Sequence, residues 1–239
     1  MSNYDVFSEF YDDMMGDRSR NVALVAGLIT KHRPKAKKVL ELACGTGAIL
    51  KALSGKYEVS GLDVSRGMLA KAKKKLPKAG FYRQSMARFS IKDKFDVVLC
   101  LFDSINHLLS FKEWEAVFAG AKKHLNEGGL FVFDMNTPEK LEKLSSSRPA
   151  VIKAGKNFTI MDVTSSGGGL TDWKLTVFEH KKGNVYARHD DMAREISFPA
   201  EAVKRSLAKT YEKITMTSSE KGPRGSRPGR VYFCCEKKA

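Results

Sequence analysis

Two glycines and an unexpected carboxylate stand around the end of the first apolar segment of the chain. Residues 39–50 read VLELACGTGAIL, in which five residues suited to a buried strand are followed by two closely spaced glycines and then by a segment that favours a helix. Gly45 and Gly47 let the backbone pass close under a ligand and let the helix begin. Glu41 places a carboxylate inside this core strand. The pattern predicts a nucleotide-type ligand over the end of the strand.

A second acid, Asp63, ends the next apolar segment. Its distance of about 20 residues from the glycine turn is the spacing at which a carboxylate can accept both hydroxyls of an adenosine ribose. Asp63 could instead cap the following helix, but Ser65 is better placed for a cap. The dinucleotide fingerprint is excluded because Leu50 stands where it requires a third Gly or Ala, and the P-loop because no Lys-Ser/Thr pair follows the second glycine.

A third group of polar side chains follows the apolar run at 95–102. The stretch LFDSINHLL, residues 101–109, contributes Asp103, Asn106 and His107. Histidine has the intrinsic pKa best suited to a general base at neutral pH, which makes His107 the candidate for that role. A histidine that makes only a structural hydrogen bond is an equal alternative, and the sequence leaves both open.

The elements that must position these residues alternate through the first 145 residues. We expect helices at 18–32, 48–54, 66–76 and 111–125, and strands at 38–43, 57–63, 80–85, 95–102 and 130–136. The continuous apolar run at 95–102 indicates a strand buried on both faces of a parallel sheet. This alternation predicts a doubly wound α/β sheet with right-handed crossovers, which binds ligands at the carboxyl ends of its strands.

The periodicity changes after this unit. Between 151 and 194 apolar and polar residues alternate in stretches separated by Gly-rich turns, which predicts a small antiparallel β insertion. The α/β domain then comprises 1–150 and 195–239. A helix at 199–208 and strands at 211–217 and 230–236 return the chain to the main sheet, with a basic Gly/Pro-rich loop at 218–229 between the two strands.

Composition bounds the class of protein. A chain of 239 residues with 42% hydrophobic and 29% charged residues is typical of one soluble globular domain. It shows neither a secretory signal nor an apolar run near the roughly 20 residues of a membrane helix, so we expect a cytoplasmic protein without a membrane partner. The four cysteines lack metal-ligand spacing, which predicts buried reduced thiols and no metal site.

The formal net charge of +15 leaves a choice of partners open. Lysine and arginine gather at 31–38, 71–78 and 220–230. The first two clusters lie at expected helix ends, where cations also favour the helix dipole. A solvated surface is the favoured interpretation, and an RNA-facing patch is the alternative.

Taken together, these motifs resemble the class I S-adenosylmethionine-dependent methyltransferases. VLELACGTG matches their first motif, GLDVSRGMLAKAK the acidic loop after the second strand, FYRQSMARF the adenine-contact segment and KHLNEGGLFVFD the turn into strand five. The lead-in YDVFSEFYDDMM (4–15) and the DSINHL segment are closest to the small-molecule branch. The resemblance covers nearly the whole chain and implies a Rossmann-like sheet that binds S-adenosyl-L-methionine.

The resemblance also implies cofactor contacts. Glu41 would steer the backbone or the methionine amino group, while Tyr11 and Arg20 would close over the cofactor from an N-terminal lid. Tyr11, like Tyr4, could equally be a packing aromatic. Ser85 stands where the family usually has an Asp that accepts a hydrogen bond from the adenine amino group, so this bond would carry no charge. The remaining cofactor contacts implied are Ala43, Cys44, Gly45, Gly47, Asp63, Val64, Met68, Met86, Ala87, Leu101 and Phe102.

On the acceptor side, the resemblance implies methyl transfer to a nitrogen or oxygen of a small molecule, with the β insertion over the substrate site. The implied substrate contacts are Asp103, Asn106, His189 and Asp191, the last two of which could also form a solvated strand end. Two rival functions stay open. The basic charge favours an RNA (tRNA) methyltransferase, and Ser85 leaves room for a non-catalytic S-adenosylmethionine-binding protein. The oligomeric state stays open as well.

Overall fold

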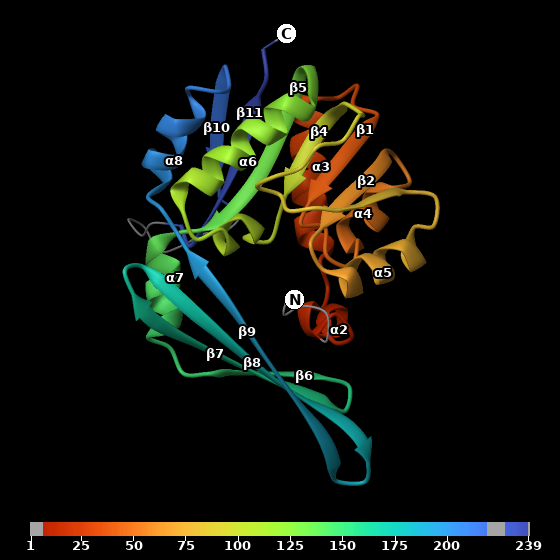
Figure 1. The fold of residues 1–239 in the computed structure, drawn as a ribbon, viewed down its shortest axis with the longest axis vertical. Coiled ribbons are helices and arrows are strands. Elements are labelled where there is room, and N and C mark those ends of the chain that lie inside the picture. The colour runs from red at the N-terminus through yellow and green to blue at the C-terminus, as the bar shows by residue number, and fades with distance from the viewer. Residues whose placement is uncertain (1–6, 219–227, 239) are drawn as a thin grey trace.

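The computed structural model describes residues 7–218 and 228–238 (Figure 1). Tyr4 and all but the ends of the loop 218–229 therefore lie outside the described residues. Within the described ranges, no helix is long and apolar enough to cross a membrane. All four cysteines are buried free thiols, as the sequence predicted.

Seven strands form the main sheet in the order β10-β11-β5-β4-β1-β2-β3. Their bounds are β1 Lys38–Leu42, β2 Glu58–Asp63, β3 Gly80–Arg83, β4 Phe95–Cys100, β5 Leu125–Asn136, β10 Lys213–Thr217 and β11 Arg230–Glu236. β1 pairs in parallel with β2 on one side and β4 on the other, whereas β11 is antiparallel to both β5 and β10. The strand order reverses between β1 and β4, and a doubly wound sheet opens its ligand crevice at such a point.

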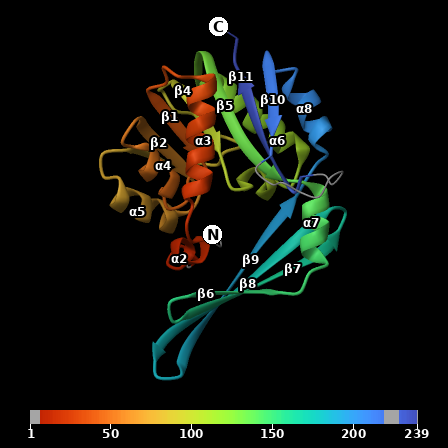
Figure 2. The same cartoon turned by 180° about the vertical axis from the view of Figure 1, so that it is seen from behind.

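Helices cover both faces of this sheet (Figures 1 and 2). On one face α6 (Phe111–His124) and α8 (Ala200–Leu207) bury Trp114 and Val203 in a cluster that includes Leu40. On the other, α3 (Ser19–His32), α4 (Ala48–Leu53) and α5 (Arg66–Lys75) share a cluster with Val39. Neighbouring residues of β1 thus pack on opposite faces of the sheet, which is why Val39, Leu40 and Leu42 are all apolar and buried. The doubly wound α/β prediction is confirmed.

A separate antiparallel sheet follows, as the alternating pattern predicted (Figure 1). Its four strands are β6 Ala150–Ala154, β7 Asn157–Gly167, β8 Leu170–Lys182 and β9 Val185–Ile196. The sequence reasoning counted three of these strands and missed β6. It also missed α7 (Pro138–Ser145), although Thr137 caps this helix and a proline opens it, which is a recognisable start signal.

A short N-terminal helix, α2 (Tyr11–Met15), lies between the second sheet and the carboxyl edge of the main sheet (Figures 1 and 2). Just before it, Phe7 packs in a small core with Leu175 and Val177 of β8. The 3-10 turn η1 (Ser104–His107) follows β4 at the same edge. α2, η1 and the second sheet therefore surround the strand ends from which the sequence motifs project.

Candidate active site

The turn after β1 has the backbone that its glycines permit. Gly45 and Gly47 have φ of 52° and 72°, in the left-handed region that favours glycine. The Asp63 carboxylate accepts the Gly45 N–H at 2.9 Å and the Ser65 N–H at 2.8 Å. Ser65 in turn accepts the Met68 N–H at 3.1 Å and caps α5, as expected from the sequence. Asp63 thus joins the ends of β1 and β2, and each of its oxygens accepts one backbone N–H here.

A cavity opens at the end of β1, beside this turn. Its lining residues are Tyr11, Arg18, Glu41, Ala43, Cys44, Gly45, Thr46, Ala48, Ile49, Leu101, Phe102 and Ser104. We call it the cofactor cavity. Six of the cofactor contacts that the resemblance implied meet here with Tyr11, because three chain segments converge at the switch point between β1 and β4.

Two buried groups of opposite charge offer unused hydrogen-bonding atoms to this cavity. Glu41 is 3% exposed, and its Oε2 has no hydrogen-bond partner among the described residues. Burial raises the pKa of Glu41 well above its ordinary value, although the nearby Arg18 guanidinium acts in the opposite direction. Arg18 lies beside the rings of Tyr11 and Phe102, and its Nε and Nη2 likewise lack partners within the described chain.

The structure does not place Arg20 in this cavity. Arg20 is exposed on α3, whereas Arg18, the residue that precedes the helix, lines the cavity. Two residues along a helix turn the side chain by more than half a circle, so only one of these arginines can face the site. The sequence DRSR offered both, and the position of the helix start decided between them.

The residues expected around the adenosine lie at the end of β2, on α5 and after β3, outside the lining of the cofactor cavity. Ser85 accepts the Ala87 N–H at 3.3 Å within its own turn. Met86 is buried in the main core, where the Cys100 thiol lies 3.8 Å from its sulfur. Val64 is half exposed and Met68 is buried. The adenosine contacts of Asp63, Val64, Met68, Ser85, Met86 and Ala87 stay predictions.

A second cavity, of about 120 Å³, lies between α2, the turn after β4 and the second sheet. Its lining residues are Phe7, Tyr11, Met14, Met15, Phe102, Asp103, His107, Met161, Trp173, Leu175, Ala193 and Glu195. We call it the acceptor cavity. Tyr11 and Phe102 line both cavities, so the two adjoin at these rings.

The turn between the cavities is held in a strained conformation. Phe102 and Asp103 have φ of 56° and 51°, which is rare for residues other than glycine. The carboxylate of Asp134 on β5 accepts the N–H of both, at 2.7 and 3.0 Å. Such strain persists only where surrounding contacts impose it, and it clusters at functional sites. Asp134 therefore presents Phe102 and Asp103 to the cavities.

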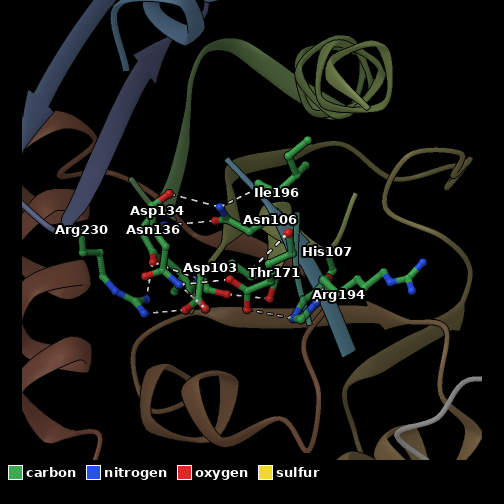
Figure 3. Close-up of polar contacts among 12 residues, drawn as sticks. Asp103, Asn106, His107, Asp134, Asn136, Thr171, Arg194, Ile196 and Arg230 are labelled. Atoms are coloured by element: carbon green, nitrogen blue, oxygen red, sulfur yellow. Dashed lines mark hydrogen bonds and ion pairs between the residues drawn. The ribbon is translucent and has the colours of Figure 1, made fainter. Parts of the chain in front are cut away.

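A buried ionic network surrounds Asp103 (Figure 3). The Arg230 guanidinium bridges Asp103 and Asp134, with N–O distances of 2.5 Å to each, and the Asn136 amide donates to Asp103 at 2.8 Å. Burial favours a higher pKa for Asp103, but the charge and hydrogen bond of Arg230, together with the charges of His107 and Lys140, outweigh burial and lower that pKa. At Glu195, which is 3% exposed, burial and the negative Asp103 together raise the pKa well above its ordinary value.

The expected role of Asn106 in substrate binding is wrong. Asn106 is completely buried. Its amide donates to the carbonyls of Asn136 and Ile196 at 3.1 and 2.9 Å, and its carbonyl accepts the Asn136 N–H at 3.1 Å (Figure 3). These three bonds fasten η1 to β5 and to the end of β9. Both polar atoms of the Asn106 side chain therefore make hydrogen bonds within the fold, so the residue has a structural role.

His107 does line the acceptor cavity. Its Nδ1 lies 3.1 Å from the Arg194 carbonyl, which can only accept, so Nδ1 carries the proton in this contact. Its Nε2 lies 3.9 Å from Glu195. The structural bond and the general base that the sequence left open are therefore both compatible with this geometry.

The two substrate contacts expected from the insertion lie farther along β9. His189 packs on the ring of Phe10 and pairs with Glu179 at 2.9 Å, outside the acceptor cavity. Asp191 shares the inward face of the sheet with Ala193 and Glu195, but it does not line the cavity either. Its Oδ2 is buried without a hydrogen-bond partner among the described residues.

Sequence reasoning missed five residues of the site, namely Arg18, Asp134, Trp173, Glu195 and Arg230. Some signals were available. Asp134 interrupts a core strand, as Glu41 does, and Trp173 and Glu195 occupy alternate positions that face inward on their strands. Arg230 was assigned to the basic loop, whereas its side chain is only 16% exposed and ion-paired.

Comparison with known proteins gives one consistent result. Residues 39–129 match the family model of a methyltransferase domain. The dTDP-3-amino-3,6-dideoxy-alpha-D-glucopyranose N,N-dimethyltransferase of Streptomyces fradiae is 28% identical, covering 87% of this chain and 82% of its own. An S-adenosylmethionine-dependent methyltransferase from Clostridium acetobutylicum shares the fold with a TM-score of 0.83 at 22% identity, over 99% of both chains. The sugar N-methyltransferase KedS8 from Streptoalloteichus sp. gives 0.82 at 22%, over 98% of this chain and 93% of its own.

The polar groups of the cofactor cavity complement the amino-acid end of S-adenosylmethionine. That end carries one ammonium and one carboxylate group, and the cavity atoms without partners among the described residues belong to a buried carboxyl, Glu41, and to the guanidinium of Arg18. Charged groups without partners are costly to bury, which makes a zwitterionic ligand the complement of this pair. The matched domain, the motifs and the fold agree with this fit: residues 39–129 form a methyltransferase domain, and the chain has the fold of the class I S-adenosylmethionine-dependent methyltransferases.

Proposed function

We propose that this enzyme methylates an amino nitrogen of a small molecule. The observation that carries the proposal is the pair of carboxyl groups, Asp103 and Glu195, in the wall of the acceptor cavity. Buried carboxylates attract a cation, and in neutral water an amine acceptor is protonated to an ammonium ion. A hydroxyl acceptor could donate a hydrogen bond to these acids but would lack the attraction between opposite charges.

The two cavities are arranged for direct transfer. Bound S-adenosylmethionine supplies a methyl group on a positively charged sulfur. Tyr11 and Phe102 line both cavities, and the strained turn at Phe102 fixes one ring between them. Holding the two reactants in line can lower the barrier by roughly 7–11 kcal/mol. The residues of this chain would therefore act mainly by aligning the acceptor nitrogen and excluding water.

The rest of the acceptor cavity suits a compact ring. Met161, Trp173 and Leu175 of the second sheet give it an apolar wall opposite the acids. An amino sugar has such a ring, with a polar edge and an apolar face. The relative from Streptomyces fradiae is named for an amino-sugar nucleotide, which supports this class of acceptor.

The test is an assay of S-adenosylhomocysteine release with matched acceptors. We would compare dTDP-3-amino-3,6-dideoxy-α-D-glucopyranose with its 3-hydroxy counterpart, free amino sugars with the parent sugars, and bulk tRNA. We expect turnover of amines, with the methyl group on nitrogen by mass spectrometry. Turnover of the hydroxyl compounds or tRNA in preference to every amine would refute the proposal.

A further inference from the structure

The two acids of the acceptor cavity come from chain segments far apart in the sequence. Asp103 follows β4, and Glu195 lies near the end of β9, in the second sheet. The Asn136 amide donates to both, at 2.8 Å to Asp103 and 3.3 Å to Glu195, and so holds the two carboxyl groups side by side. Two carboxyl groups that share a buried site favour a state in which one of them holds a proton.

The surroundings decide where this proton resides. Arg230 from β11 makes its ion pair with Asp103 and favours the ionised form of this acid. His107 acts on Asp103 in the same direction, although its Nε2 lies 3.9 Å from Glu195. Glu195 faces Asp103 and is buried more deeply, which favours its neutral form. Asp134 neutralises part of the Arg230 charge from β5. These surroundings favour a pair in which Glu195 holds the proton and Asp103 carries the negative charge.

We propose that Glu195 is the proton acceptor for the amine and that Asp103 is its partner in binding the ammonium ion. This inference rests on the proposed amine methylation. Both groups line the cavity that adjoins the cofactor cavity, so an amine placed for transfer lies within their reach. The Trp173 indole N–H, buried and without a partner among the described residues, is available to an oxygen of the same acceptor.

The proton transfers balance over one turnover. Binding of R–NH₃⁺ drives the Glu195 proton to solvent, because the incoming cation stabilises the carboxylate. Glu195 then takes a proton from the ammonium, which leaves R–NH₂ with a free electron pair. This pair forms the new N–C bond as the S–C bond breaks and its electrons pass to sulfur. The products are R–NH₂CH₃⁺ and S-adenosylhomocysteine, and Glu195 is again protonated. Arg230 and Asn136 are positioning residues, since they act through the two acids.

The first experiment compares Glu195→Gln with Asp190→Asn. Glutamine can donate to Asp103 and accept from Asn136 as a protonated glutamate does, but it cannot take a proton. Asp190 is an acid on the same strand that is exposed to solvent and paired with Arg188. General-base catalysis contributes roughly 10²–10⁴-fold, so we expect kcat of the Gln variant to fall at least about 100-fold and to lose its rise with pH. The Asn variant should match the parent enzyme.

The second experiment needs no turnover. Benzylamine is titrated calorimetrically into enzyme saturated with S-adenosylhomocysteine, in two buffers of different ionisation enthalpy, at a pH where Glu195 is protonated. The parent enzyme should release about one proton for each benzylammonium bound, in keeping with the linkage between ligand charge and a perturbed carboxyl. Glu195→Gln should bind it with none released, and benzyl alcohol should not compete.

These outcomes separate the two proposals. Proton release that depends on Glu195 supports the pair as an ammonium site even if the amine panel gives no product, in which case only the proposed function fails. The inference about Glu195 is overturned if benzylamine does not bind, if it binds without releasing a proton, or if Glu195→Gln turns over amines normally. A large loss in His107→Asn with normal pH dependence in Glu195→Gln would assign the base to His107.

Discussion

At the scale of single residues, cofactor binding depends on which charged side chains reach the cofactor cavity. Within the described part of the chain, Arg18 and Glu41 both leave hydrogen-bonding atoms of the cofactor cavity without a partner. Arg20, only two residues from Arg18, is exposed and does not line it. This neighbouring pair of arginines offers a matched comparison.

Replacing Arg18 by alanine should weaken binding of S-adenosylmethionine. A hydrogen bond to a charged group contributes roughly 1.5–3 kcal/mol, so the dissociation constant should rise by about 10- to 150-fold. Arg20→Ala should change it by less than about twofold, since less than 0.5 kcal/mol would be lost. Calorimetric titration of the two variants decides the matter. If the dissociation constant rises equally in the two variants, or more in Arg20→Ala, then Arg20 contacts the cofactor, as the sequence predicted.

Glu41 should make cofactor binding depend on pH. Burial raises the pKa of Glu41 in the free enzyme, with Arg18 lowering it and Asp63 raising it further. The protonated form cannot pair with the methionine ammonium, so affinity should increase as pH rises above the ordinary glutamate value of about 4.3 and through the raised pKa. Binding measured across this range should show the rise in the parent enzyme and not in Glu41→Gln. A parallel rise in both would place the titrating group elsewhere.

The sequence predicted the residues of the cofactor site better than those of the acceptor site. Glu41 and Gly45 belong to one continuous motif at the end of β1, and Asp63 ends the neighbouring strand β2, where it accepts the Gly45 N–H. Glu195, Arg230 and Asp134 meet Asp103 only after the second sheet and β11 have folded against β4 and β5. No short stretch of the sequence predicts that these four side chains come into contact. For Asn106 the sequence predicted a substrate contact that the structure does not show. Its side-chain polar atoms hydrogen bond to backbone groups, which a polar residue after a strand end can do as readily as bind a ligand.

At the scale of elements, α2 is held over the cofactor cavity by one acid. Asp12 accepts from Thr46 in the glycine turn at 2.6 Å and from Arg18 at 3.1 Å, and it also pairs with Lys75 of α5. Since Tyr11 of the same helix lines both cavities, we expect this helix to move when the cofactor exchanges. The sequence reasoning anticipated a lid here but not the helix, because five residues are too few for a clear periodic signal.

Asp12→Ala should loosen this helix and speed release of the cofactor product. Losing contacts worth about 1 kcal/mol should raise the dissociation rate of S-adenosylhomocysteine about fivefold, with little change in the main fold. Asp13, the next residue, is exposed on the same helix and supplies the control in Asp13→Ala. Stopped-flow displacement would measure both rates. Unchanged release from Asp12→Ala would mean that the helix is held by its apolar contacts alone.

At the scale of the whole molecule, the net charge of +15 is the feature that the proposed function does not require. One of the cations expected in an RNA-facing patch, Arg230, is instead ion-paired at the acceptor site. We therefore expect RNA binding that is weak and independent of sequence. It should vanish near physiological salt, because each phosphate contact releases counterions. Fluorescence anisotropy with labelled tRNA at several salt concentrations would test this, and tight binding at physiological ionic strength would contradict it.

The central claim is that the two adjoining cavities bring an amine to the methyl donor. The most direct measurement is an experimental structure of the enzyme with S-adenosylhomocysteine and an amino-sugar nucleotide bound together. We expect the methionine end of the cofactor between Arg18 and Glu41. We expect the amine nitrogen in the acceptor cavity, where it faces the sulfur and lies within hydrogen-bonding distance of Glu195. An amine bound elsewhere, for example in the apolar groove formed by Thr137, Pro199 and Met216, would contradict it.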